Sequence, residues 1–112
     1  MSDTDGYEIV IAGSNGEAVV VVAGDIDLRA RHALVEALAQ APTDGQRLAI
    51  DLSQTTFIDS TALKVLLDVW RSRTEAGLDV VIREPSPTVL RTFEIAGLAE
   101  VLPIDLADRP FL

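Results

Sequence analysis

The stretch that decides the fold is residues 51–67, which read DLSQTTFIDSTALKVLL. A short apolar strand, 47–52, leads into it, a brief polar turn is expected next, and an amphipathic helix follows. That helix begins at Asp59-Ser60-Thr61, where a carboxylate and neighbouring hydroxyls suit a helix N-terminus. Its buried face is predicted from the helical spacing of Leu63, Leu66, Leu67 and Trp70.

Further apolar residues widen the arc of this helix beyond what one core face needs: Ala62, Val65 and Val69. Either neighbouring elements cover both flanks of the helix, or part of the arc is a surface for a partner protein. The polar side is expected to carry Lys64, Asp68 and Arg71.

Towards the N-terminus, residues 7–12 and 17–23 read as strands, and the Gly-Ser-Asn-Gly turn at 13–16 joins them into a hairpin. The consecutive valines at 19–22 favour a strand that is covered on both faces and therefore lies inside the sheet. Gly24-Asp-Ile-Asp27 then breaks the pattern before a helix predicted over 28–41.

Beyond the central stretch, a strand is expected at 78–83, a helix opened by Pro85-Ser-Pro87, and a last short strand at 101–104. This alternation predicts parallel strands with right-handed crossovers, and the first hairpin strand becomes an antiparallel edge. The expected class is α/β, with helices packed on a mixed, mostly parallel sheet. We expect one domain over 1–112, with loose ends at 1–6 and 105–112.

Bulk properties narrow the possible functions. The 112 residues are 48% hydrophobic and carry a formal charge of −9, so an aliphatic core forms inside an acidic surface. Because acidic surfaces repel phosphate groups, neither nucleic acid nor a membrane is expected as a direct partner. The start of the sequence lacks the pattern of a signal peptide, and no apolar run approaches the ~20 residues of a membrane span. A cytoplasmic location is therefore expected.

The sequence offers little for catalysis. Asp25, Asp27, Asp51 and Asp59 fall at predicted strand ends, where a magnesium or phosphoaspartate site would need them. A receiver-type site also needs an acidic pair after the first strand and a late lysine, and both are missing. There is no cysteine, and the sequence has no Gly-x-Ser-x-Gly motif whose serine could pair with the one histidine, His32, as a nucleophile. We expect no enzymatic activity and no cofactor.

Ser60 has two interpretations. The first amides of a helix lack intrahelical partners, and the helix dipole favours negative charge there, so a seryl phosphate would be accommodated. Phosphorylation would add about −1.5 to −2 charge beside Asp59 and, if their turn lies at the same end, beside Asp25 and Asp27. In the simpler interpretation, Asp59 or Ser60 only caps the helix, and composition alone favours this one.

The central stretch resembles the signature of STAS domains, which sulfate transporters share with anti-sigma factor antagonists. The resemblance lies in Asp51-Leu-Ser and in residues 57–63, FIDSTAL, and it is strongest to the small single-domain antagonists. Residues 24–28, GDIDL, resemble the acidic turn after the second strand of the family, and 90–98, LRTFEIAGL, resemble its late helix. The likeness extends from Tyr7 to about Ile104.

This resemblance implies a switch. Ser60 would be the phosphorylated residue, with Thr61 as a secondary acceptor. The unphosphorylated protein would bind an anti-sigma factor that is also a serine kinase and uses its own ATP and magnesium, and this binding would release the sigma factor. A serine phosphatase would reverse the modification. The partner-binding surface implied by the resemblance comprises Asp25, Asp27, Asp59, Thr61, Ala62 and Lys64.

The sequence departs from the motif at two positions. Ala62 stands where the family usually has glycine, and Lys64 stands where a small residue is frequent. Alanine adds a methyl group but favours helix, and Lys64 brings a cation within one turn of Ser60. These departures leave open an alternative: a non-phosphorylated STAS adaptor in a larger complex, such as a lipid transporter or a signalling assembly.

Overall fold

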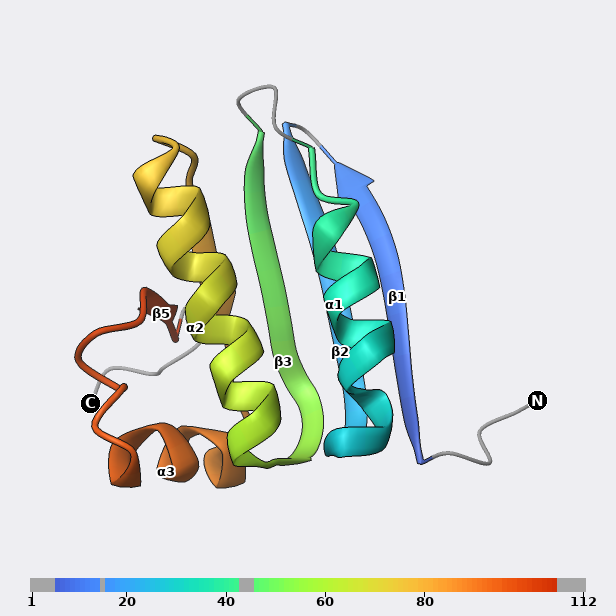
Figure 1. Ribbon diagram of the computed structural model, residues 1–112, viewed down its shortest axis with the longest axis vertical. Helices are drawn as coiled ribbons and strands as arrows, with labels where there is room; N and C mark the ends of the chain where they lie inside the picture. Colours follow the sequence, from blue (N-terminus) through green and yellow to red (C-terminus); the bar gives the residue numbers. More distant parts are fainter. Residues whose placement is uncertain (1–5, 15, 43–45, 107–112) are drawn as a thin grey trace.

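The computed structural model describes residues 6–14, 16–42 and 46–106. Its sheet has five strands in the order β1-β2-β3-β4-β5. The strands are β1 (Tyr7–Ser14), β2 (Glu17–Ile26), β3 (Arg47–Ile58), β4 (Val80–Arg83) and β5 (Ile104–Asp105). The helices are η1 (Leu28–Ala30), α1 (Arg31–Ala39), α2 (Ser60–Glu75) and α3 (Pro87–Ile95). Of the strand pairings in the described residues, only β1–β2 is antiparallel, which confirms the predicted hairpin edge on a mostly parallel sheet (Figure 1).

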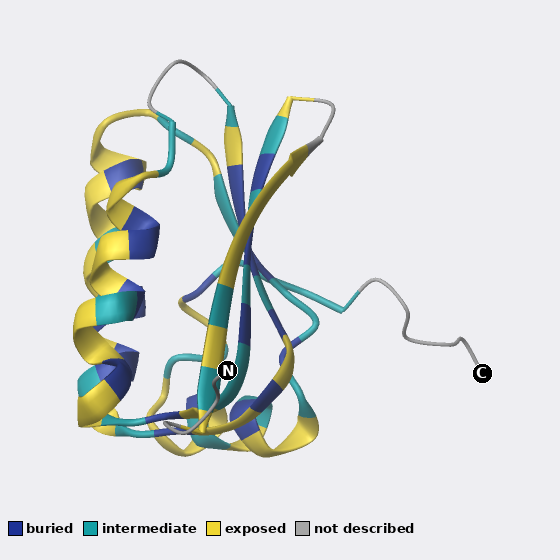
Figure 2. Ribbon diagram, turned by 90° about the vertical axis from the view of Figure 1, so that its right-hand side faces the viewer, coloured by how far each residue is buried: buried dark blue, intermediate teal, exposed yellow. Residues whose placement is uncertain are grey.

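Helices α1 and α2 lie side by side on one face of the sheet, and α3 lies across one end of it (Figures 1 and 2). The strands alternate accordingly: Ala18, Val20 and Val22 of β2 are buried, whereas the residues between them are half-buried. The valine run therefore belongs to an internal strand, as predicted. From the helices, Leu34 and Leu66 complete the core with almost no exposed surface.

The opposite face of the sheet carries an ion pair that spans β3. Both guanidinium ends of Arg83 on β4 donate to the carboxylate of Glu17 on β2, at 3.0 and 2.9 Å. Arg47 approaches the same carboxylate at 3.9 Å. Ala49, in the middle strand, has no exposed surface. The pair therefore links strands that are not themselves neighbours.

The prediction of a polar turn after residue 52 is wrong, because β3 continues to Ile58. The register against β2 shifts between Val21 and Ala23 and again between Gly24 and Asp25, so β3 absorbs extra residues in bulges. At the first bulge the Asp51 carboxylate accepts hydrogen bonds from the amide and hydroxyl of Ser53, at 2.9 and 2.7 Å. Polar side chains thus satisfy the irregular backbone within a strand.

Other boundaries also moved. The helix expected over 28–41 begins as the 3-10 turn η1 and ends at Ala39, and the strand expected at 78–83 begins at Val80. Asp105, placed in the loose C-terminal end, is paired with Arg83 in β5. Residues 1–5 and 107–112, also expected to be loose, lie outside the described residues.

Gly24 fixes the start of β1 against the end of β2. It has φ +88°, and a Cβ there would lie 2.1 Å from the carbonyl oxygen of Gly6. The next residue, Asp25, donates its amide to the same oxygen at 3.0 Å. Only glycine permits both this backbone conformation and this approach of the chains.

Candidate functional site

The candidate site is the start of α2. The Asp59 side chain accepts the Ala62 amide at 3.0 Å, and the Asp59 carbonyl accepts the Leu63 amide at 3.0 Å. Asp59 is therefore the N-cap, and Ser60 is an exposed first helical residue whose hydroxyl is not used for capping. In the described part of the chain, the amides of Ser60 and Thr61 have no hydrogen-bond partner.

The acidic turn at the end of β2 lies directly beside this helix start. Asp59 donates its amide to the Ile26 carbonyl at 3.1 Å, and Asp25 is paired with Phe57 in the sheet register. Because parallel strands end at the same edge of a sheet, the turn and the helix start meet there (Figure 1). The expected closeness of Asp25 and Asp27 to Ser60 follows from this register.

These turn aspartates already have partners. Exposed Asp25 accepts a hydrogen bond from the Thr56 hydroxyl on the neighbouring strand. Asp27 caps η1 through the Arg29 amide at 3.0 Å and forms an ion pair with the Arg29 guanidinium at 3.2 Å. The Arg29 side-chain hydrogen bond is the main reason that the pKa of Asp27 lies below its ordinary value. Asp27 is therefore anionic at neutral pH.

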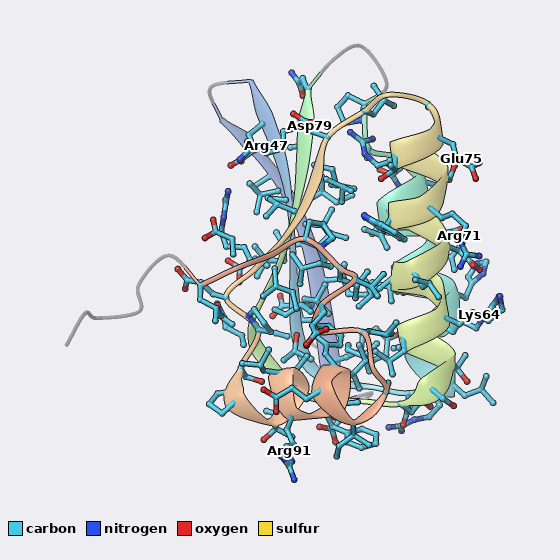
Figure 3. The ribbon with its side chains drawn as sticks, turned by 90° about the vertical axis from the view of Figure 1, so that its left-hand side faces the viewer. Arg47, Lys64, Arg71, Glu75, Asp79 and Arg91 are labelled. Atoms are coloured by element: carbon cyan, nitrogen blue, oxygen red, sulfur yellow. The ribbon has the colours of Figure 1, made fainter. Side chains whose placement is uncertain are left out.

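One residue predicted for the partner surface, Ala62, is buried. Ala62 has no exposed surface, because its side of α2 faces the sheet, so its assignment to a contact surface is wrong. Lys64 is exposed and forms an ion pair with Asp68 one turn further along at 3.3 Å, on the outer side of α2 (Figure 3). Thr61 is half-buried beside Ser60.

The wider carboxylate cluster does not form. Asp51 is tied to Ser53 and lies opposite Arg83, earlier along β3 than the helix start. Within residues 6–14, 16–42 and 46–106, no group of acidic or histidine side chains is arranged to hold a metal ion. His32 lies on α1 and contacts Glu36 at 3.2 Å.

Sequence reasoning missed the exposed apolar residues of this end. Leu28 in η1 is 68% exposed, and Phe57 near the end of β3 is 46% exposed. Leu28 follows Ile26 by two residues and Phe57 precedes Asp59 by two, so both lie close in sequence to the hydrogen bond between Asp59 and Ile26. In a strand, a large aromatic that is exposed between buried Thr55 and Ile58 indicates a binding surface. Sequence reasoning missed this signal because it predicted a turn there instead of a strand.

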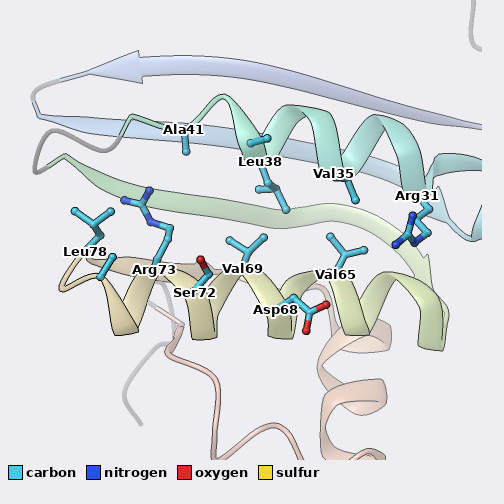
Figure 4. Close-up of a pocket in the computed structure, with 12 residues that line it drawn as sticks. Arg31, Val35, Leu38, Ala41, Val65, Asp68, Val69, Ser72, Arg73 and Leu78 are labelled. Carbon is cyan, nitrogen blue, oxygen red and sulfur yellow. The ribbon is translucent and has the colours of Figure 1, made fainter.

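A groove of about 450 Å³ separates α1 from α2 (Figure 4). Val35 and Leu38 of α1 face Val65 and Val69 of α2 across it, and Ser60 is not among its lining residues. Val65 is 6% exposed. Neighbouring elements therefore cover Ala62 and Val65 of the wide apolar arc. The exposed apolar residues near the helix start, Leu28 and Phe57, belong to other elements.

Comparison with known proteins agrees with this architecture. The family model described as "Mlab, STAS domain" matches residues 9–104. The chain belongs to the STAS domain family. Within the described residues, this STAS domain has no helix long and apolar enough to cross a membrane.

Among curated relatives, the STAS domain is 40% identical to the anti-sigma-F factor antagonist RsfB of Mycobacterium tuberculosis, over 59% of this chain and 55% of that protein. The chain thus spans about half the length of this relative. It is 33% identical to the anti-sigma-B factor antagonist of Listeria monocytogenes, over 76% and 75% of the two chains.

Among solved structures, an anti-sigma factor antagonist from Mycobacterium paratuberculosis superimposes with a TM-score of 0.75 at 31% identity. The match covers 93% of this chain and 89% of that one. The likeness therefore extends over most of the STAS domain.

Proposed function

We propose that this STAS domain is an anti-sigma factor antagonist whose contact with its partner is switched by phosphorylation of Ser60. The names of its relatives support the antagonist role, including proteins from Mycobacterium tuberculosis and Listeria monocytogenes. The observation that carries the switch is the position of Ser60: exposed, at the first turn of a 16-residue helix, with Asp59 taking the cap.

The helix start suits a phosphate chemically. The unpartnered amides of Ser60 and Thr61 lie at the positive end of the α2 dipole, so they would stabilise an added anion. Asp25, Asp27 and Asp59 lie around the same edge of the sheet. A phosphate would add about −1.5 to −2 charge to this acidic end and would change what can bind to it.

We assign the unphosphorylated contact to the apolar pair Leu28 and Phe57, bordered by Asp25 and Asp27. A partner with an apolar centre and basic rim matches this surface. The partner would be an anti-sigma factor that also acts as serine kinase. It would transfer the γ-phosphoryl group of ATP to the Ser60 oxygen, so that an O–P bond forms, ADP leaves and the hydroxyl proton passes to a base of the kinase.

In this cycle the chain is a substrate and a binding partner. It would show no turnover by itself and would need no cofactor, since ATP and magnesium are bound by the kinase. Dissociation of the complex would follow phosphorylation, because the new charge lies beside the apolar contact. A serine phosphatase would hydrolyse the phosphoserine and restore binding.

The test uses Ser60→Ala and Ser60→Asp, with Ser72→Asp as a matched control. Ser72 is an exposed serine on the same helix, so it reports added charge on α2 away from the helix start. With the cognate anti-sigma factor and ATP, the wild type should take up phosphate and Ser60→Ala should not, although it still binds. Ser60→Asp should weaken binding roughly tenfold or more, a loss of at least ~1.4 kcal/mol.

Equal binding of Ser60→Asp and wild type would show that the charge switch is wrong. Uptake of phosphate by Ser60→Ala would move the acceptor elsewhere, with Thr61 as the nearest hydroxyl. If the wild type binds its partner but takes up no phosphate from it, the chain is an unswitched adaptor. Even for such an adaptor, loss of partner binding in Leu28→Ser or Phe57→Ser would show that the partner contacts this apolar pair.

A further inference from the structure

Among the described residues, no strand lies beside the outer edge of β1. β1 is terminal in the sheet order, and Figure 2 shows it facing the viewer with much of its length exposed. Because the Asp25 amide donates to Gly6, the bonded pairs with β2 fall at even positions of β1. The amides and carbonyls of Tyr7, Ile9, Ile11 and Gly13 therefore point outward.

This edge lacks the features by which proteins usually protect an exposed strand. It has no proline and no lysine, and its one charged residue is Glu8. Val10 is 46% exposed on the open face of the sheet, and Ile11 is 45% exposed on the face that α1 covers. A strand of this kind is a template for another strand.

We propose that β1 pairs with β1 of a second copy in an antiparallel arrangement, with Val10 on the two-fold axis. Opposed residues in an antiparallel pair share a face, so Val10 lies opposite Val10 and Ile9 opposite Ile11 of the second copy. The outward-pointing groups of Ile9 and Ile11 then form hydrogen-bonded pairs. This register also covers exposed Val10 with Val10 of the second copy, and exposed Ile11 with Ile9 of the second copy.

The packing of Val10 against Val10 favours this register, and charge repulsion does not oppose it. Glu8 lies opposite Ala12 of the second copy, and the two Glu8 residues are about 14 Å apart at ~3.4 Å per residue, beyond the screening length of about 8–10 Å. Helix α1 packs over β1 and β2, so the two α1 helices would lie roughly 10 Å apart, an ordinary helix-packing distance.

The short paired run indicates a reversible dimer. The paired run, residues 7–13, is only about 23 Å long at ~3.3 Å per residue. Strand pairing of that length, with one helix pair beside it, lies at the lower end of specific interfaces, which bury about 1,200–2,000 Å². The two-fold axis would place the Ser60 ends of the copies at opposite ends of the joined sheet, so pairing leaves both exposed.

The first experiment measures mass by sedimentation equilibrium from micromolar to millimolar concentration. The wild type should shift from 12.0 kDa towards twice that mass. Val10→Lys puts two cations face to face on the axis and should raise the dissociation constant roughly tenfold or more. Val101→Lys is the matched control, because Val101 is 45% exposed and lies outside β1, and it should dimerise like the wild type.

The second experiment uses the absence of cysteine from the sequence. Val10→Cys should form a disulfide-linked dimer under mild oxidation, because the Cα atoms of this non-hydrogen-bonded pair would be about 4.5 Å apart, within disulfide range. Ile11→Cys and Val101→Cys should cross-link far more slowly. A wild type that stays monomeric at millimolar concentration, or equal cross-linking of Val10→Cys and Val101→Cys, would overturn the proposal. Faster cross-linking of Ile11→Cys would overturn the register.

Discussion

At the scale of single residues, the site depends on a division of labour between Asp59 and Ser60. Sequence composition left either residue as the cap. The structure gives the cap to Asp59, whose side chain accepts the Ala62 amide, and this leaves the neighbouring hydroxyl exposed. A phosphate acceptor has to be reachable by another protein, and a serine engaged in capping would be less so.

Replacing Asp59 tests this division. Asp59→Ala removes the acceptor for the Ala62 amide, and we expect the free energy of unfolding to fall by about 1 kcal/mol in urea titrations at neutral pH. Asp59→Asn retains a capping oxygen and should lose less. Equal stability of Asp59→Ala and wild type would mean that the cap contributes nothing to α2.

At the scale of elements, the β1–β2 hairpin is joined to the site through Gly24. Its positive φ and the close Gly6 carbonyl leave no room for a side chain. We expect Gly24→Ala to destabilise the protein by roughly 2–4 kcal/mol, from backbone strain and overlap together. Thermal or urea unfolding would measure this loss.

Gly77 provides the matched control for that substitution. It also has a positive φ, of +75°, but nothing lies within 4 Å of a Cβ placed there. Gly77→Ala should therefore cost only the backbone term, roughly 1–2 kcal/mol. Similar losses in the two variants would show that the contact with Gly6 does not matter.

The element scale also shows what could be predicted from the sequence. Hydrophobic periodicity found the hairpin, the order of strands and helices, and Ser60 at the start of α2. It failed at 53–56 because the polar residues there lie in a strand through bulges, and those depend on the register with β2. The family resemblance, not periodicity, placed Ala62 on the partner surface, and only the packed sheet shows that this side of α2 is covered.

At the scale of the whole molecule, the Glu17–Arg83 pair ties the sheet together. The hydrogen bonds that Arg83 donates to the Glu17 carboxylate hold the pKa of Glu17 below the ordinary value of 4.5. Since the lowered pKa belongs to the folded state, the pair stabilises the protein fully above pH 4.5, and this contribution is lost as the pH falls through the folded-state value.

Glu17→Gln should therefore lower the free energy of unfolding at pH 7 by about 1 kcal/mol, near the upper end for ion pairs that water still reaches. Below the folded-state pKa of Glu17, the variant and the wild type should become equally stable. Urea titrations across this pH range would show the difference closing. A difference that stays constant with pH would mean that the charge on Glu17 plays no part.

The hydrogen bond from Asp59 to Ile26 also has a kinetic consequence. It joins residues far apart in the chain, and the parallel pairing of β2 with β3 around it is equally non-local. Contacts of this kind form late, because the entropy cost of closing a long loop comes before the contacts can stabilise the chain. During synthesis, the Ser60 end should therefore take shape only when β2 pairs with β3, so a chain that has not yet made this pairing would not compete for the partner.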